Sequence, residues 1–107
     1  MQDPIMAKSS SHGAVAPITV RPSGLYCEAE LWLTKDAGTT KAATSGLVSF
    51  TSSGTAQSVS FSLTMPSAWG SYQIYIDVYA DGMLIGAYVA TDLVSIPDVS
   101  IGEPEWT

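Results

Sequence analysis

Apolar and polar residues alternate along several stretches of the chain, and a period of two is typical of half-buried β-strands. In residues 25–34 every second position is apolar, and in residues 57–64 three large apolar residues alternate with serines. Residues 71–80 follow the same rule. The Asp-Gly pair at residues 81–82 is a strong signal for a two-residue hairpin leading into residues 83–89. These stretches predict long antiparallel strands.

Shorter strands are expected between them, at residues 18–20, 39–44, 47–51 and 92–96, and the alternation loses phase near residues 90–92, which predicts a bulge or kink there. Turn residues recur every eight to twelve positions, the spacing of a sandwich or barrel. No stretch has the period of an amphipathic helix. The sequence therefore predicts an all-β fold, an antiparallel two-sheet β-sandwich of about seven strands.

The two ends of the chain lack this alternation. Residues 1–14 are small and polar, and we interpret them as a disordered leader or tag. Residues 15–96 form the predicted sandwich. Residues 97–107 contain two prolines and three acids and are expected to be a linker toward a following domain. No signal peptide is recognisable, and no apolar run approaches the ~20 residues that span a bilayer.

Composition narrows the choice of partners. The 107 residues are 46% hydrophobic and only 13% charged, which is typical of a folded chain. The formal net charge is -6, and the four basic residues form no run. Binding to nucleic acid requires a cationic surface, so we expect no nucleic-acid partner, and the short apolar runs predict no membrane insertion.

Few residues are available for catalysis. His12 is the only histidine and lies in the expected leader, so a metal site built on histidines is not expected. A serine nucleophile needs a positioned base, and the serines of residues 57–64 point to solvent in the predicted strand. Cys27, the only cysteine, cannot form a disulfide within the chain and is expected to be buried and inert. We expect no enzyme, no cofactor and no metal.

The acidic side chains suggest no further chemistry. Glu28 and Glu30 share the outward face of one predicted strand, where two carboxylates could serve acid–base catalysis but more often lie in water. Calcium binding by aspartates is also conceivable, but no calcium-loop spacing is present at the three positions concerned, Asp77, Asp81 and Asp92.

Outward aromatic side chains are the best candidates for a ligand or partner surface, because exposed aromatic patches stack on sugars or on partner side chains. The alternative is cross-strand pairing that only stabilises the sheet. Tyr75 and Tyr79 flanking Asp77 make the most plausible small patch. The full candidate set is Tyr26, Trp32, Trp69, Tyr75, Asp77 and Tyr79.

The run Gly-Ser-Tyr-Gln-Ile-Tyr-Ile-Asp-Val at residues 70–78 resembles the F strand of immunoglobulin-like and fibronectin type III-like sandwiches. The resemblance implies that Tyr72 forms a corner, with its hydroxyl bonded to backbone a few residues upstream. It also implies that Cys27 on strand B contacts Ile74 on strand F where immunoglobulin domains have a disulfide. Strands B and F lie in different sheets, so the outward aromatics of residues 25–34 and 71–80 would not form one platform.

The stretch from Phe50 to Gly86 also looks like the bacterial and archaeal cell-adhesion-related (CARDB-type) modules, and the similarity covers roughly residues 15–96. This resemblance implies a domain of an extracellular or cell-surface protein. The leading hypothesis is a structural or adhesive module that spaces neighbouring domains of the same chain and offers a sheet face or edge to a protein partner. The alternative is a carbohydrate-binding module that uses exposed Tyr and Trp side chains on a glycan.

Overall fold

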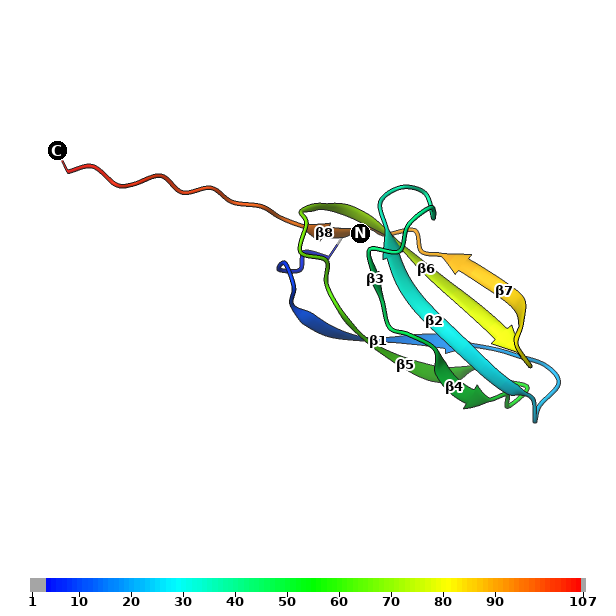
Figure 1. Ribbon diagram of the computed structural model, residues 1–107. Coiled ribbons are helices and arrows are strands. Elements are labelled where there is room, and N and C mark those ends of the chain that lie inside the picture. Colours follow the sequence, from blue (N-terminus) through cyan, green and yellow to red (C-terminus); the bar gives the residue numbers. More distant parts are fainter. Residues whose placement is uncertain (1–3, 107) are drawn as a thin grey trace.

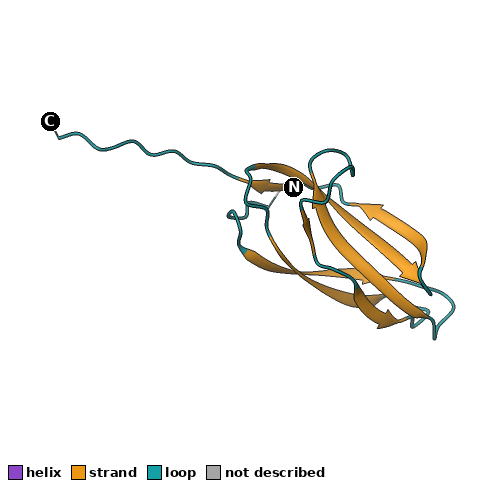
Figure 2. Ribbon diagram, viewed as in Figure 1, coloured by secondary structure: helices purple, strands orange, loops and turns teal. Residues whose placement is uncertain are grey.

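The chain folds into β-strands joined by loops, with no helix in the part that the structure describes (Figures 1 and 2). The computed structural model describes residues 4–106. The all-β, antiparallel two-sheet class predicted from the alternation is confirmed. The described strands are β1 Ser11–Ile18, β2 Tyr26–Thr34, β3 Ala43–Thr44, β4 Val48–Thr51, β5 Gln57–Thr64, β6 Gly70–Ala80, β7 Met83–Val89 and β8 Val94–Ile96.

Two sheets face each other. The smaller sheet is the antiparallel pair β1–β5. In the larger sheet β2 and β6 are the long central strands; β3 and β4 pair with β2, and β7 and β8 pair with β6. β7 and β8 therefore follow one another along β6, opposite its two halves, because β7 pairs with Tyr75–Ala80 and β8 with Gly70–Tyr72.

The main core lies between the two sheets. In β5 the predicted alternation is confirmed, since every serine is exposed while Val59, Phe61 and Leu63 are buried. Their partners across the core come from β2, β6 and β8, and include Leu33, Tyr72 and further apolar side chains. Burial of these side chains removes apolar surface from water, which is the main force that holds two sheets together.

The first strand begins earlier than the sequence suggests. Residues 11–14, expected to be disordered, form the start of β1 and pair with β5 from Ser11 opposite Thr64 onward. Residues 4–6 are also ordered, because the Met6 N–H donates to the Ser95 carbonyl at 3.0 Å. Small polar residues give little hydrophobic signal, but their backbone groups can complete a ladder. Residues 1–3 of the expected leader lie outside the described residues.

β2 and β6 lie side by side in one sheet, so the expectation that they belong to different sheets is wrong. Cys27 is fully buried, but it lies opposite Ala80, whereas Ile74 lies opposite Leu33. Six strand positions separate Ala80 from Ile74, which corresponds to about 20 Å. The expected contact between Cys27 and Ile74 therefore does not form.

The start of β6 is held by a side chain. The buried Tyr72 hydroxyl donates to the Ala68 carbonyl, four residues upstream, at 2.7 Å. This is the bond expected of a corner tyrosine. It secures the loop before β6 to the core through a residue that also lies opposite Val94 of β8.

The β6–β7 hairpin has the two-residue turn that the sequence predicts. Asp81 and Gly82 both have positive φ, 50° and 79°, as a type I′ turn requires. The bulge lies elsewhere than expected: Val78 is opposite Gly86 while Tyr79 is opposite Leu84, so Ile85 is the extra residue. The kink is thus inside β7 rather than near residues 90–92.

Candidate functional site

β7 is an exposed edge strand. It closes the order β3-β2-β6-β7, and all seven of its residues are exposed. Its sequence, MLIGAYV, contains no charged residue and no proline. Edge strands are usually protected from further pairing by charges, proline, bulges or a covering segment. Of these devices β7 has only the bulge at Ile85, so its backbone and apolar side chains are open to another strand.

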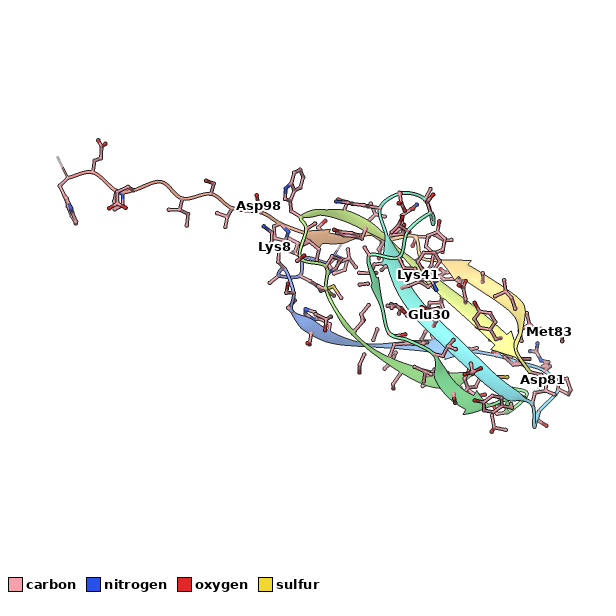
Figure 3. The ribbon with its side chains drawn as sticks, viewed as in Figure 1. Lys8, Glu30, Lys41, Asp81, Met83 and Asp98 are labelled. Atoms are coloured by element: carbon pink, nitrogen blue, oxygen red, sulfur yellow. The ribbon has the colours of Figure 1, made fainter. Side chains whose placement is uncertain are left out.

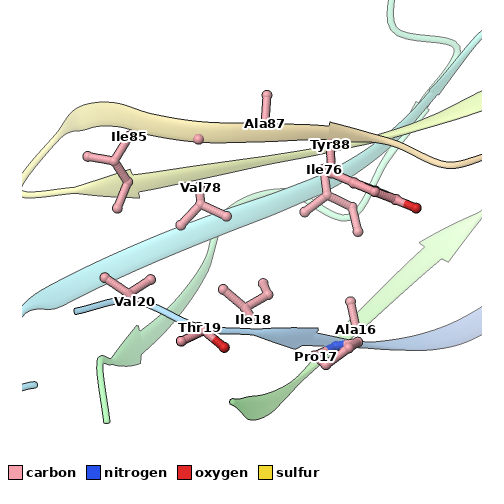
Figure 4. Close-up of a pocket in the computed structure, with 11 residues that line it drawn as sticks. Ala16, Pro17, Ile18, Thr19, Val20, Ile76, Val78, Ile85, Ala87 and Tyr88 are labelled. Carbon is pink, nitrogen blue, oxygen red and sulfur yellow. The ribbon is translucent and has the colours of Figure 1, made fainter. Parts of the chain in front are cut away.

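An apolar groove lies between β7 and β1 (Figure 4). It has a volume of about 550 Å³, and its lining consists of residues 16–20, Ile76 and Val78 of β6, and residues 85–88. None of these residues is charged. β1 and β7 are both edge strands, so no backbone ladder joins the two sheets on this side. The groove can therefore accept apolar side chains from a strand that lies along either edge.

Gly86 forms part of the groove wall, opposite Val78. Nothing lies within 4 Å of the position a Cβ would take, and its φ is outside the left-handed region. The fold itself therefore does not require glycine at this position. Glycine inside a strand often marks the close approach of a ligand or another backbone, and here it leaves the centre of the groove open.

The outer face of β2 and β6 holds most of the predicted aromatic surface. Because the two strands are neighbours, Trp32 lies opposite Tyr75, and Asp77 and Tyr79 continue the same face of β6. The Trp32 and Tyr75 ring centroids are 4.6 Å apart with planes tilted by 38°. Trp32 Nε1–H also donates to Asp77 Oδ2 at 3.0 Å. The structure thus joins four of the six candidates.

Trp32 is nevertheless only 6% exposed. Besides the Tyr75 ring, the Lys41 ammonium lies over the indole, 5.1 Å from the ring centroid. A buried indole cannot stack on a ligand, so the expectation that Trp32 is an exposed binding residue is wrong. Its contacts are the cross-strand pairing that was the alternative interpretation. Tyr75 and Tyr79 remain half-buried on this face.

Glu30 is buried on the same face, contrary to the expectation that it lies in water. Its carboxylate accepts hydrogen bonds from Lys41 Nζ at 2.7 Å and from the Thr44 hydroxyl (Figure 3). Burial raises the pKa of this carboxyl, but the bonds from Lys41 and Thr44 outweigh it, so the pKa lies below its usual value. The bond from Glu30 in turn raises the pKa of Lys41. The ionised pair therefore stabilises the fold at neutral pH and loses this contribution as the pH falls through the lowered pKa of Glu30.

The other two candidates lie at opposite ends of the sheet. Tyr26 is exposed at the start of β2, close to Asp81, and its hydroxyl lies 3.1 Å from that of Ser49. Trp69 is exposed in the loop before β6, where its carbonyl accepts a bond from Lys35. Neither belongs to the cluster of Trp32 and Tyr75.

The remaining reactive side chains are engaged in ordinary contacts. His12 lies in β1, not in a disordered leader, with Nε2 at 2.8 Å from the Ser10 hydroxyl. That hydroxyl donates its single proton to the Ala7 carbonyl at 2.6 Å, so His12 Nε2 must be the donor to Ser10 and is not placed as its base.

Among the described residues no group of three or more His, Cys, Asp or Glu side chains could hold a metal ion. The same residues include no helix of the length and apolarity needed to cross a membrane.

Comparison of the sequence with protein-family models gives no match, and comparison with curated proteins gives none either.

The groove is the feature that the sequence reasoning missed. One signal was present: residues 83–90 form an apolar run without a charged residue. The run predicts a strand, but period alone does not say whether both of its faces are covered. That depends on β1, which is brought beside β7 by the fold.

Proposed function

We propose that this chain is a non-catalytic interaction module that binds an extended protein segment by strand addition along β7. The observation that carries the proposal is the edge itself, seven exposed residues without charge or proline beside an apolar groove. In strand addition, main-chain hydrogen bonds supply affinity and alternate side chains enter pockets. The open backbone of β7 offers the main-chain hydrogen bonds, and the groove offers the pocket for alternate side chains.

We further propose that the module is related to the immunoglobulin-like and fibronectin type III-like sandwiches of the CARDB type, and that it works outside the cell or on its surface. The Tyr72 bond to the Ala68 carbonyl supports this relationship. In such sandwiches strands C, F and G share a sheet, so β2, β6 and β7 would correspond to C, F and G. The location outside the cell rests on the resemblance alone.

The experiment is selection of binding peptides from a phage-displayed library of random short peptides, followed by NMR mapping on the intact chain. We expect selected peptides to alternate apolar and polar residues and to shift and protect amides of β7. Gly86→Arg should abolish this binding by filling the groove, whereas Ser60→Arg, on the exposed face of β5, should not. Peptides that map to the β2–β6 face instead, or binding that survives Gly86→Arg, would contradict the proposal.

A second candidate is binding of a glycan on the outer face of β6. It is favoured by the row of Tyr75, Asp77 and Tyr79, which places two half-buried rings around a carboxylate on one strand. Affinity electrophoresis in gels containing cellulose, chitin or xylan tests it. Retardation that is lost in Tyr79→Ala but kept in Tyr88→Ala would support a glycan site, and unchanged mobility in all three gels would exclude these polysaccharides as ligands.

A further inference from the structure

The C-terminal segment has the pattern of a strand but pairs with none in the described chain. Residues 97–106 extend away from the sandwich and lengthen the molecule to 70 Å, against 24 and 23 Å across (Figure 1). Val99 and Ile101 are 76% and 86% exposed. They are two positions apart, so in an extended segment both side chains point to the same side. Ser100 and Gly102 are the intervening residues.

We propose that residues 98–103 of a second copy of this chain add as a strand to β7, with Val99 and Ile101 in the groove, so that copies associate head to tail. The proposal rests on the proposed function and names the occupant of the edge. Two apolar residues of the tail then exchange water for the apolar walls between β1 and β7, and their backbone pairs with the open edge.

β7 suits strand pairing better than β1, and the placement of the groove residues shows where an added strand would enter and leave. Pro17 of β1 has no N–H to donate, whereas β7 has no proline. Val20 and Ile85 lie at one end of the groove, and Ala16 and Tyr88 lie at the other (Figure 4). A tail antiparallel to β7 enters at Tyr88 and leaves past Ile85.

This direction matches the shape and charge of the tail. With Val99 beside Tyr88, Ile101 comes beside Gly86, where the missing side chain leaves space. Glu103, two positions further on, then reaches the end of the groove where Arg21 directly follows Val20. The uncharged part of the tail therefore lies on the uncharged groove, and its first following acid comes to the end of the groove where Arg21 follows in the sequence. Such a contact at the rim contributes more to register than to affinity.

The tail of the same molecule cannot occupy the groove in this register. Ile96 lies opposite Gly70, and Tyr88 lies opposite Ile76. The six positions between Gly70 and Ile76 span about 20 Å, whereas the three residues from Ile96 to Val99 reach at most about 11 Å. The occupant is therefore a second copy. Because donor and acceptor surfaces differ, the contact is head to tail, and it leads to open chains of molecules unless the rotation between copies closes a ring.

The test uses the full chain in analytical ultracentrifugation over a range of concentrations. We expect the wild type to form a series of oligomers. The donor variant, Val99→Asp with Ile101→Asp, should lower the association constant at least about tenfold, because it would place carboxylates in an apolar groove. The acceptor variant Gly86→Arg should have the same effect, and Ser60→Arg is the matched control that should not. Thermal unfolding of each variant shows whether it is folded.

Mixing the two defective variants gives the decisive result. The Gly86→Arg chain keeps its tail and the tail variant keeps its groove, so a mixture should form a heterodimer and nothing larger. A dimer that persists in the tail variant would show β7 pairing with β7 rather than with the tail and would overturn the proposal. A monomeric wild type whose β7 still binds displayed peptides would overturn the second copy as occupant while leaving strand addition intact. A monomer that binds no peptide at β7 would overturn both.

Discussion

β7 and β8 are consecutive strands that pair with the same strand, β6, and both are mostly apolar, yet their surroundings are opposite. Every residue of β7 is exposed, whereas Val94 and Ile96 of β8 are buried. Two contacts make the difference. The inner face of β8 packs against the main core, and its Ser95 exchanges backbone hydrogen bonds with Pro4 and Met6. At a sheet edge, burial is thus decided by whether a third segment covers the strand, not by the strand's own apolarity.

The largest expected effect comes from truncating one isoleucine in each strand. Ile96→Ala should lower the free energy of unfolding by about 2–5 kcal/mol, because Ile96 is 2% exposed and its loss leaves a cavity. Ile85→Ala, at a side chain that is 48% exposed, should change it by under about 0.5 kcal/mol. Urea denaturation of the two variants measures both values, and equal losses would break the comparison between the strands.

A smaller difference is expected for two tyrosines. Tyr72→Phe removes the bond to the Ala68 carbonyl beside β8 and should cost about 0.5–1.5 kcal/mol. Tyr88→Phe removes an exposed hydroxyl on β7 and should be neutral within about 0.5 kcal/mol. If Tyr72→Phe were also neutral in the same denaturation experiment, the corner bond would contribute nothing to holding the start of β6.

The smallest effect concerns the ion pair between Lys8 and Asp98 (Figure 3). This pair joins the N-terminal segment to the residues that directly follow β8. The hydrogen bond and charge of Lys8 lower the pKa of the Asp98 carboxyl. The pair therefore favours the folded state at neutral pH, and this contribution disappears as the pH falls through the lowered pKa. β7 contains no charged residue and has no such tie.

NMR titration of the Asp98 side chain measures this effect. The midpoint should lie below the usual value of ~3.9, and Lys8→Met should raise it toward that value. A midpoint that does not move in Lys8→Met would show that the ion pair does not persist in solution and that the cover of β8 depends on the backbone bonds of Pro4 and Met6 alone.

Strand positions could be predicted from the sequence where one face of a strand is buried and the other is in water. β5 satisfies this condition along its whole length, and its bounds at residues 57–64 agree with the prediction. β6 and the Asp81-Gly82 turn were also predictable, since the alternation and the turn residues are local signals. β1 was expected only at residues 18–20 and was missed at residues 11–17, because histidine, glycine, alanine and proline give a weak alternation.

The candidate site was predictable only in part. The sequence placed Tyr75, Asp77 and Tyr79 on one outward face, as the structure has them. It did not predict that Trp32 and Glu30 are buried on that face. Their cover comes from Lys41, which lies in the loop before β3 and makes no periodic pattern. A side chain that points outward from a strand is exposed only if no loop folds over that face of the sheet.

The sequence by itself determined the class of the fold, the inner and outer faces of β5 and β6, and the turn between β6 and β7. These properties depend on residues within a few positions of each other, so period and turn chemistry are sufficient to predict them. Only the tertiary structure decided that β2 is the neighbour of β6, that Pro4–Met6 covers β8, and that β1 and β7 leave a groove between them. Each of these depends on contacts between segments far apart in the chain. Local period and turn residues do not encode such contacts, because an edge can gain free energy by pairing with any of several segments.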